Sequence, residues 1–563
     1  MAQKHSTEHK EQEETEVLPK PTTTKLPPIN QDPKKPQNPS KPPLTDGLSD
    51  LGSPSDKQAT TPKSSSHTRR EEQVQILESA ERSLKATKPS ESTKKYKEKS
   101  RVLNLMRLIA FVLSNYYFGY YLFISNVLAP TLTEDVFGVN EDDREKIAGN
   151  FGFLYAVGCI ISSISAGFLT RNVGRIRLAL VLEACKAVSI FFYRFENLRV
   201  FLAVRLVSGV LGGVGLALGP LLCKEILPRR IRAYGGTASI CVSAGFQIIA
   251  SLQNPIFGGK DGLKEHWKTT ITWPIAFSCL VSLLTAATMC GTESPNYYYE
   301  HYAEDLPKLR SKVLAFAKRI YTDESAEQFT NDYIEEKRRM AAKTSSSKKV
   351  TLRALFGAKY RKRFILMIVL NVLQQMTGTN FMLFFSTQLF DKISGNGAMM
   401  TFVLTFGIFS GALASVFVIS KGRKPGLFYS TLLSAINLFI LIFAIRYEIG
   451  ILAMISMFLY VSGFGLGYTS IFNLYIVEVL PALGAGIAYG VRWVTSGALG
   501  FLGPVMLDLV GIEVIVSSFF VCTVGSCFVI WIFCEETAGK SEEEIERAFN
   551  GDRIEVKTAE RKG

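Results

Sequence analysis

The chain has 563 residues, of which 47% are hydrophobic and 20% are charged, and its formal net charge is +14. From Leu103 onward, long apolar stretches alternate with short charged loops, as a polytopic membrane protein requires, and this pattern excludes a soluble enzyme. A net positive charge can indicate nucleic acid binding, but many of the basic residues flank the apolar stretches or lie in the first hundred residues. Membrane lipid with anionic headgroups is the simpler partner, and we expect no nucleic acid.

The first hundred residues differ in composition from the rest of the chain. Residues 1–101 are rich in Lys, Pro, Ser, Thr and Glu and have few aliphatic clusters. A segment of this kind cannot bury enough apolar surface to fold by itself. It is therefore predicted to be a disordered cytoplasmic tail, available to a cytoplasmic partner. No apolar segment follows Met1 closely, so we expect no cleaved signal peptide.

Twelve apolar segments, each near the roughly 20 residues that cross a bilayer, form two sets of six. The predicted spans are 103–130, 148–170, 176–193, 199–222, 232–254 and 273–291, then 364–390, 398–419, 425–446, 450–478, 484–508 and 513–534. The polar segment between the two sets has helical periodicity in two places. The sequence thus predicts an all-α polytopic membrane protein, with an N-terminal six-helix bundle (102–292), a cytoplasmic helical linker (293–363), a C-terminal six-helix bundle (364–535) and a cytoplasmic C-terminal tail (536–563).

The basic residues of the loops predict the orientation of the spans. They gather before the first span and after the second, fourth and eighth spans: Lys94, Lys95, Lys97, Lys99, Arg171, Arg175, Arg177, Arg229, Arg230, Arg232, Lys421, Arg423 and Lys424. The loop after the first span is acidic instead. By the positive-inside rule, both termini of this multi-pass protein are cytoplasmic. We expect the protein in the plasma membrane, and the sequence leaves an organellar membrane open as the alternative.

Three side-chain amides lie within the predicted span 364–390: Gln374, Gln375 and Asn380. Amides are costly in hydrocarbon unless they face a cavity or a partner, so three in one span favour a functional cluster over helix-to-helix packing. Because an amide both donates and accepts hydrogen bonds, such a cluster suits a neutral polyol or sugar better than an ion.

Around this cluster the chain resembles the sugar porter family of the major facilitator superfamily, over about residues 103–548. The resemblance rests on motifs that occur in order: Gly167-x-x-x-Arg171-x-x-Gly174-Arg175, Arg205-x-x-x-Gly209, Pro220-x-x-x-x-Glu225-x-x-Pro228-x-x-x-Arg232, Glu293-Ser294-Pro295, Gln374-Gln375-x-x-Gly378-x-Asn380, Phe384-Phe385-Ser386-Thr387, Gly422-Arg423-Lys424 and Glu536-Thr537-Ala538-Gly539. It implies a major facilitator fold whose two halves move by alternating access, with Gln374, Gln375 and Asn380 bonded to a hexose. Phe384 and Phe385 stand where the family has tyrosines, so aromatic packing remains without phenol donors.

The same resemblance implies a latch of ion pairs at the cytoplasmic helix ends. Its members are Glu225, Arg232 and Glu478 together with Arg175 and Arg423. An acid and a base at neighbouring helix ends can pair and hold one state of a gate. The alternative is that these residues are ordinary interfacial charges.

The chain departs from the family in its titratable residues. Tyr121 stands where proton-coupled members carry Asp, and no histidine lies inside a span. The one carboxylate at mid-membrane depth is Glu183, which can pair with Lys186 on the same helix face. Proton coupling needs a titratable group exposed in turn to each side of the membrane. The sequence therefore favours a uniporter over a proton symporter.

Other expected sugar contacts are altered. Gln247 lies on roughly the face where the family has a span 5 glutamine, Asn473 replaces the span 10 tryptophan, and Arg492-Trp493 replaces Asn-Trp in span 11. Trp493 is a candidate stacking or gating ring. If Arg492 faces the cavity it favours an anionic ligand or needs a carboxylate, and otherwise it lies at the cytoplasmic end and snorkels.

Together these observations predict a facilitative transporter for a hexose or a similar polyol. Two alternatives remain open: a carrier of an organic anion or another small metabolite, and a nutrient sensor that binds sugar and signals through the N-terminal tail. We expect no enzyme activity, cofactor or metal, because the polar regions contain no nucleophile-base set and no metal-ligand spacing.

Overall fold

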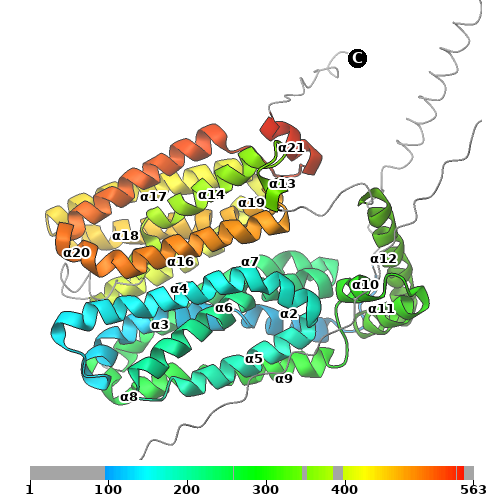
Figure 1. Ribbon diagram of the computed structural model, residues 1–563, viewed down its shortest axis with the longest axis horizontal. Helices are drawn as coiled ribbons and strands as arrows, with labels where there is room; N and C mark the ends of the chain where they lie inside the picture. Colours follow the sequence, from blue (N-terminus) through cyan, green and yellow to red (C-terminus); the bar gives the residue numbers. More distant parts are fainter. Residues whose placement is uncertain (1–95, 258, 345–351, 384–396, 541, 551–563) are drawn as a thin grey trace, which may run out of the picture. The chain divides into compact units, whose positions relative to one another are not determined.

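The computed structural model describes residues 96–257, 259–344, 352–383, 397–540 and 542–550 (Figure 1). They belong to one compact unit, Thr93–Gly563. Within the described residues the chain is helical apart from an isolated bridge between Glu98 and Tyr321, which confirms the all-α prediction. The predicted N-terminal tail lies almost entirely outside the described residues, as do Phe384 and Phe385.

The N-terminal half contains eight α-helices and a π-helical turn among the described residues. They are α2 (Arg101–Leu113), α3 (Tyr116–Thr131), η1 (Leu132–Val136), α4 (Glu141–Asn172), α5 (Arg175–Phe192), α6 (Leu198–Ile226), α7 (Arg229–Ile256), α8 (Lys260–Thr272) and α9 (Ile275–Met289). Helix α8 falls where the sequence predicted a loop. Its apolar residues Leu263, Trp267 and Ile271 are buried, and α8 joins α9 into one apolar stretch, Asp261–Met289.

Three further helices follow the N-terminal half, and the C-terminal half comes after them. The helices between the halves are α10 (Pro295–Tyr302), α11 (Leu306–Ile320) and α12 (Asp323–Thr344). The C-terminal half contains α13 (Leu352–Leu355), α14 (Arg361–Met376), α16 (Gly397–Val418), η2 (Ile419–Lys421), α17 (Arg423–Arg446), α18 (Gly450–Phe464), η3 (Gly465–Ile471), α19 (Phe472–Val479), α20 (Ala482–Phe533) and α21 (Glu542–Asn550).

Ten helices among the described residues are long and apolar enough to cross a membrane. The predicted span 176–193 is helical as α5 but is not among the ten, and it carries Arg177, Glu183 and Lys186. The predicted span 484–508 forms the first part of α20, which turns at Gly511. A multi-pass membrane protein is thus confirmed, while the number of twelve spans stays a prediction.

Two predicted spans are interrupted near their middle. In span 1, α2 ends at Leu113 and α3 begins at Tyr116. In the predicted span 364–390, α14 ends at Met376, and Gly378 adopts a positive φ of 87°. The described part of this span, Arg361–Leu383, is long and apolar enough to cross a membrane, but its helix is interrupted beside the amide cluster. The physical reason for the interruption is the left-handed backbone at Gly378, which glycine adopts without strain.

The buried apolar residues form one core at one end of the membrane helices and two cores at the other. We call the end where α10–α12 adjoin α5 and α6 the linker end, and the opposite end the far end. At the far end, one core joins both halves and includes Phe246 and Leu404. At the linker end, the N-terminal half has its own core with α11, and the C-terminal half has a separate core around Tyr475.

Contacts between the halves agree with this division. Helix α4 packs along α20, and α7 packs along α16. Near the far end, Ser251 and Thr405 share a hydroxyl hydrogen bond of 3.0 Å, and the rings of Phe153 and Phe501 are 5.4 Å apart. The structure is therefore closed between the halves at the far end.

Replacing Gly378 by Ala tests the break after α14. The added Cβ would lie 2.1 Å from a ring carbon of Phe519, and the residue would also have to hold a φ of 87°. We expect a loss of about 1–3 kcal/mol in the free energy of unfolding, measured as a lower melting temperature of the purified protein. The matched control is Gly490→Ala within α20, where a Cβ meets no atom within 4 Å. Equal melting temperatures for the two variants would contradict the left-handed backbone at Gly378.

Candidate functional site

The three amides of the sequence analysis lie at the break that follows α14. The Gln374 Nε2 donates to the carbonyl of Tyr468 at 3.4 Å, and the Gln375 Oε1 accepts from the Asn380 Nδ2 at 2.7 Å. The same Asn380 nitrogen approaches the Ser496 hydroxyl at 3.3 Å. Gln375 and Asn380 are therefore brought together, and they lie against α20.

Gln374 bonds to the π-helix η3 and not to the other two amides. In a π-turn one residue is added to the helical turn, so main-chain carbonyls leave the regular ladder, and such turns are frequent at functional sites. The carbonyl of Tyr468 in η3 is the acceptor for Gln374. The Gln374 Oε1 is buried without a hydrogen-bond partner. This amide therefore supports the backbone with one atom and leaves the other available.

Arg492 lies one helical turn from Ser496 on α20, toward the linker end. Its Nε donates to the Asn371 Oδ1 and its Nη1 to the Asn473 Oδ1, both at 2.8 Å. The guanidinium carbon is 5.5 Å from the ring centre of Phe472 and 5.0 Å from that of Tyr489. The side chain is only 9% exposed, so it does not snorkel to the surface.

The remaining candidates for the site are spread over both halves. Trp493 meets Phe118 of the N-terminal half edge to face, with ring centres 5.8 Å apart. Gln247 is buried on α7, and its Oε1 has no hydrogen-bond partner. Asn473 is held through Arg492, as described above.

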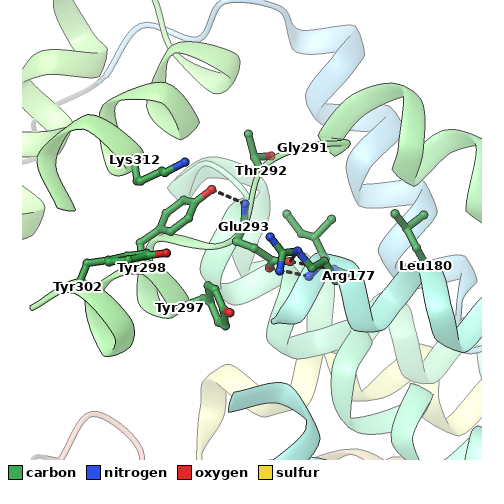
Figure 2. Close-up of a pocket in the computed structure, with 10 residues that line it drawn as sticks. Arg177, Leu180, Gly291, Thr292, Glu293, Tyr297, Tyr298, Tyr302 and Lys312 are labelled. Atoms are coloured by element: carbon green, nitrogen blue, oxygen red, sulfur yellow. Dashed lines mark hydrogen bonds and ion pairs between the residues drawn. The ribbon is translucent and has the colours of Figure 1, made fainter. Parts of the chain in front are cut away.

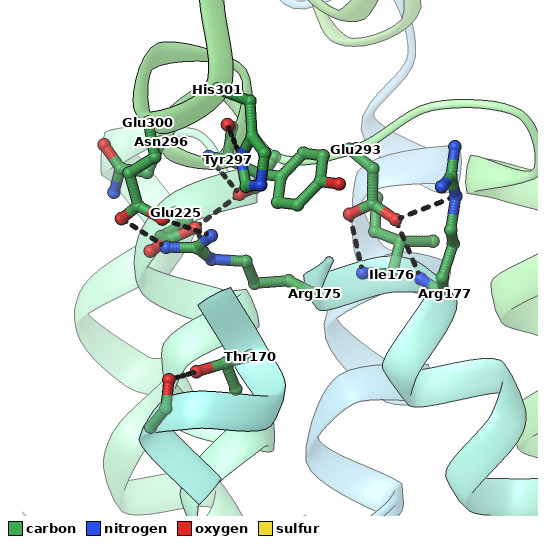
Figure 3. Close-up of polar contacts among 12 residues, drawn as sticks. Thr170, Arg175, Ile176, Arg177, Glu225, Glu293, Asn296, Tyr297, Glu300 and His301 are labelled. Carbon is green, nitrogen blue, oxygen red and sulfur yellow. Dashed lines mark hydrogen bonds and ion pairs between the residues drawn. The ribbon is translucent and has the colours of Figure 1, made fainter. Parts of the chain in front are cut away.

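A second set of side chains gathers where α5 and α6 meet α10 (Figure 3). Arg175 forms two hydrogen bonds with Glu300, at 2.9 and 3.1 Å, and its Nε lies 3.2 Å from Glu225. Glu293 accepts from the backbone N–H groups of Ile176 and Arg177, each at 2.9 Å. Glu293 thus caps the N-terminus of α5, where helix N–H groups favour an anion.

The C-terminal half repeats this arrangement. Arg423 lies 3.0 Å from Glu478, and Glu536 accepts from the backbone N–H groups of Arg423 and Lys424 at the start of α17. The hydroxyl after each capping glutamate donates to the paired acid, from Ser294 to Glu225 and from Thr537 to Glu478. The structure therefore pairs Arg175 with Glu225 and Arg423 with Glu478, each within one half. Arg232 instead donates from its Nε to the carbonyl of Leu227 at 3.2 Å.

A family model described as sugar (and other) transporter matches residues 106–549 of this chain. The chain belongs to this family. It is 25% identical over 439 residues to "Solute carrier family 2, facilitated glucose transporter member 2" of Gallus gallus, across 72% of this chain and 76% of that protein. It is 24% identical over 456 residues to "Probable plastidic glucose transporter 1" of Arabidopsis thaliana, across 78% and 82%.

Solved structures that resemble this transporter support its fold. One is the proton:xylose symporter XylE bound to 6-bromo-6-deoxy-D-glucose, with a TM-score of 0.64 and 18% identity, covering 80% of this chain and 99% of that one. Another is an inward open conformation of XylE from E. coli, with a TM-score of 0.63 and 19% identity, covering 79% and 99%. The major facilitator fold is confirmed, and family membership confirms that the chain is a membrane transporter and not an enzyme.

A cavity of about 150 Å³ adjoins the charged cluster of the transporter's N-terminal half (Figure 2). Its lining includes Arg177, Glu293, Tyr297, Tyr298 and Lys312. The backbone N–H of Glu293 donates to the Tyr298 hydroxyl at 2.8 Å, so the wall is fixed by a bond within it. The cavity shares no residue with the amides at Gln374, Gln375 and Asn380, and it is a separate feature of the linker end.

The two capping glutamates of the transporter differ in their pKa. Burial raises the pKa of Glu293 above its ordinary value, although backbone N–H groups and Arg177 oppose that rise. Burial acts in the same direction on Glu536, but four backbone N–H groups outweigh it and hold the pKa of Glu536 below its ordinary value. Folding therefore favours the ionised form of Glu536 in the C-terminal half and disfavours the ionised form of Glu293 in the N-terminal half.

Glu293 and Glu536 lie in motifs of the sequence, but no role was predicted for either glutamate, and Glu300 was not predicted as a site residue. The signal for the caps was their matching position, since each glutamate follows the last span of a half and precedes a hydroxyl residue. Glu300 carried no such signal, because it meets Arg175 only when α10 folds against α5. The expected pairing of Glu183 with Lys186 is present at 2.6 Å, and both side chains are fully buried.

Glu293 and Glu536 should each be replaced by Gln in turn. The difference in melting temperature between wild type and variant should then depend on pH in opposite directions for the two positions. The Glu536 charge contributes stability that is complete above the ordinary pKa of 4.5 and is lost as pH falls through the lowered pKa of the folded state. The melting-temperature difference between wild type and E536Q should therefore shrink in acid. The raised pKa of Glu293 disfavours its charged form, so wild type should gain stability over E293Q as pH falls through that raised pKa.

These differences are measured by thermal unfolding of the purified protein over a pH series. The exposed Glu304→Gln supplies the baseline, since Glu304 lies on the surface after α10. If the melting temperatures of E293Q and E536Q, each compared with wild type, changed with pH in the same direction, the two capping glutamates would not differ as described.

Proposed function

We propose that this transporter moves a hexose or a similar polyol across its membrane by alternating access, as a facilitative uniporter. The observation that carries the proposal is the cluster of Gln374, Gln375 and Asn380 beside the helix break at Gly378. Interrupted helices at membrane depth supply the sites of many transporters, because freed polar groups there line the path of the substrate. The relatives named as glucose transporters make glucose the first substrate to test.

The amides offer both donors and acceptors to sugar hydroxyls. Gln375 and Asn380 bond to each other, and in this proposal a hydroxyl inserts between them by exchanging one hydrogen bond for two. The unpartnered Oε1 atoms of Gln374 and Gln247 accept further hydroxyls. Trp493 stacks against the ring or gates it, and Asn473 contributes a weaker contact. Phe384 and Phe385 lie outside the described residues and remain part of the proposed aromatic wall.

The distribution of the apolar cores supports alternating access. One core joins the halves at the far end, while each half keeps its own core at the linker end. We assign the linker end to the cytoplasm from the basic loops, so the described state is closed toward the outside, and both termini are cytoplasmic. The plasma membrane is the proposed location.

The charged clusters serve, in this proposal, as latches of the linker end. Arg175 with Glu225, and Arg423 with Glu478, tie neighbouring helix ends within each half. When the halves meet at the linker end, these pairs exchange partners across the interface and stabilise the opposite state. Arg232 on α7, which donates to the carbonyl of Leu227 in this state, is the further cation of the proposed latch.

Substitutions in the amide cluster test the site. We expect Gln375→Ala and Asn380→Ala each to lower the initial rate of glucose uptake into proteoliposomes by about tenfold, because each removes at least one hydrogen bond to the substrate. The matched control is Asn437→Ala, a buried amide of the same half whose side chain bonds only within α17. Uptake that is unchanged in both cluster variants would remove the cluster from the site.

Uniport is tested by an imposed proton gradient. Glu183 is the one mid-membrane carboxylate among the described spans and is paired with Lys186, so no free acid is offered to either side. We expect radiolabelled glucose counterflow to be saturable and equal with and without a pH gradient across the liposome membrane. Accumulation of glucose driven by the gradient would overturn uniport and leave sugar transport in place.

A further inference from the structure

Arg492 is a buried cation beside the amide cluster, and among the residues that the structure describes no acid forms an ion pair with it. Its two side-chain hydrogen bonds go to the neutral amide oxygens of Asn371 and Asn473. A guanidinium has five N–H donors, so three remain, and Nη2 makes no hydrogen bond although it is buried. The rings of Phe472 and Tyr489 also lie beside the guanidinium, and neither side chain is a carboxylate.

The depth of Arg492 places this charge within the hydrocarbon region. Arg492 lies ten residues into α20 from Ala482, and Asn371 lies ten residues into α14 from Arg361, which corresponds to about 15 Å along each helix. Ser496 and Gln375 follow one turn later on the same two helices, at about 5.4 Å. The cation and the proposed hydroxyl-binding amides therefore form adjacent layers between α14 and α20.

The other buried cations of the described chain each bond to an acid or to a main-chain carbonyl, and Arg107 and Arg363 bond to carbonyls. Lys186 pairs with Glu183, and it also donates to the carbonyl of Ser114 at the break in span 1. Arg175 has Glu225 and Glu300. Arg205 also has a buried Nη2 without a hydrogen bond, but its other nitrogens bind the main-chain carbonyls of Phe151 and Tyr121.

Arg492 differs from these because its hydrogen bonds go to side-chain amide oxygens alone, and each amide is itself anchored, since Asn371 donates to the carbonyl of Met367 and Asn473 to that of Thr469. A charged side chain at this depth is costly unless a partner compensates its charge. Asn371 holds Nε and Asn473 holds Nη1. Because the guanidinium is planar, these two bonds also fix the position of Nη2 before a ligand binds. A cation that is held in place, unbalanced and adjacent to a polar site is suited to an anionic ligand, whose charge would supply the missing partner.

We propose that the substrate of this site is an anionic hexose derivative, with its carboxylate or phosphate bound by Nη2 of Arg492 and its hydroxyls bound by Gln375 and Asn380. This inference rests on the proposed function and narrows its substrate class. One helical turn separates the two layers, so a single sugar with an anionic group at one end reaches both. A carboxylate and a phosphate present the same oxygen acceptors to the guanidinium, and experiment distinguishes them.

The test uses the full-length protein in liposomes and compares counterflow of radiolabelled glucose, glucuronate and glucose 6-phosphate. In wild type we expect one of the two anions to be transported and to compete with glucose. In Arg492→Gln, counterflow of that anion should fall by about tenfold or more relative to the glucose counterflow of the same variant. Arg492→Lys keeps the charge without the planar fork and should retain part of the anion counterflow.

Two controls separate this role from a structural one. Arg446→Gln removes an exposed arginine of the same half, which pairs with Glu513, and should leave all three counterflows unchanged. Thermal unfolding gives the second readout. Removing an unbalanced charge should leave the melting temperature of Arg492→Gln equal to or above that of wild type, whereas loss of a structural anchor would lower it.

The outcomes are distinct for the inference and for the proposed function. Glucose counterflow without transport or competition by either anion overturns the inference and leaves hexose transport standing. Anion counterflow that is equal in wild type and Arg492→Gln also overturns it, as does a lowered melting temperature together with equal loss of all counterflows. If neither glucose nor an anion moves, both the inference and the proposed function fail.

Discussion

Backbone polar groups inside a bilayer have no water to bind, and this constraint governs where the transporter can depart from regular helix. At three of the departures from regular helix, a side chain donates to a main-chain carbonyl. At the break in span 1, Lys186 donates to the carbonyl of Ser114, and at the break after α14, the Tyr460 hydroxyl donates to the carbonyl of Thr377. In η3, Gln374 donates to the carbonyl of Tyr468. The groups that support the breaks are therefore part of, or adjacent to, the polar interior that the proposed site uses.

The two halves of the chain repeat each other in the contacts of their capping glutamates as well as in the order of their helices. Gly174 and Gly422 both have positive φ, of 97° and 138°, and a Cβ on either would lie within 2.9 Å of the capping carboxylate. Glycine lets that carboxylate approach the helix start closely. The two copies differ because α10 adds Glu300 to the first. This second acid fastens the linker helix to the N-terminal half, so the two are expected to move together.

The sequence was sufficient for features that depend on periodicity and composition, and insufficient for those that depend on how helices meet. Long apolar runs predicted the all-α membrane fold, and the spacing of Gln374, Gln375 and Asn380 located the polar cluster on one segment. The break at Gly378 was not predicted, because Thr-Gly-Thr inside an apolar run is equally compatible with a continuous helix. The helix α8 was missed since its polar residues resemble a loop, and only burial of Trp267 and its neighbours reveals the packed face. The neutral surroundings of Arg492 could not be read from spacing, because Asn371 and Asn473 lie far from it in the chain.

The apolar core that joins the halves at the far end also has a thermodynamic consequence. Opening that end must expose rings and aliphatic groups such as Phe246 and Leu404 to water. Hydration of apolar surface raises the heat capacity, so in the proposed alternating-access cycle the exposure of this core contributes a positive term to the heat capacity change of opening. In the proposed cycle this term adds curvature to the temperature dependence of the equilibrium between the two states.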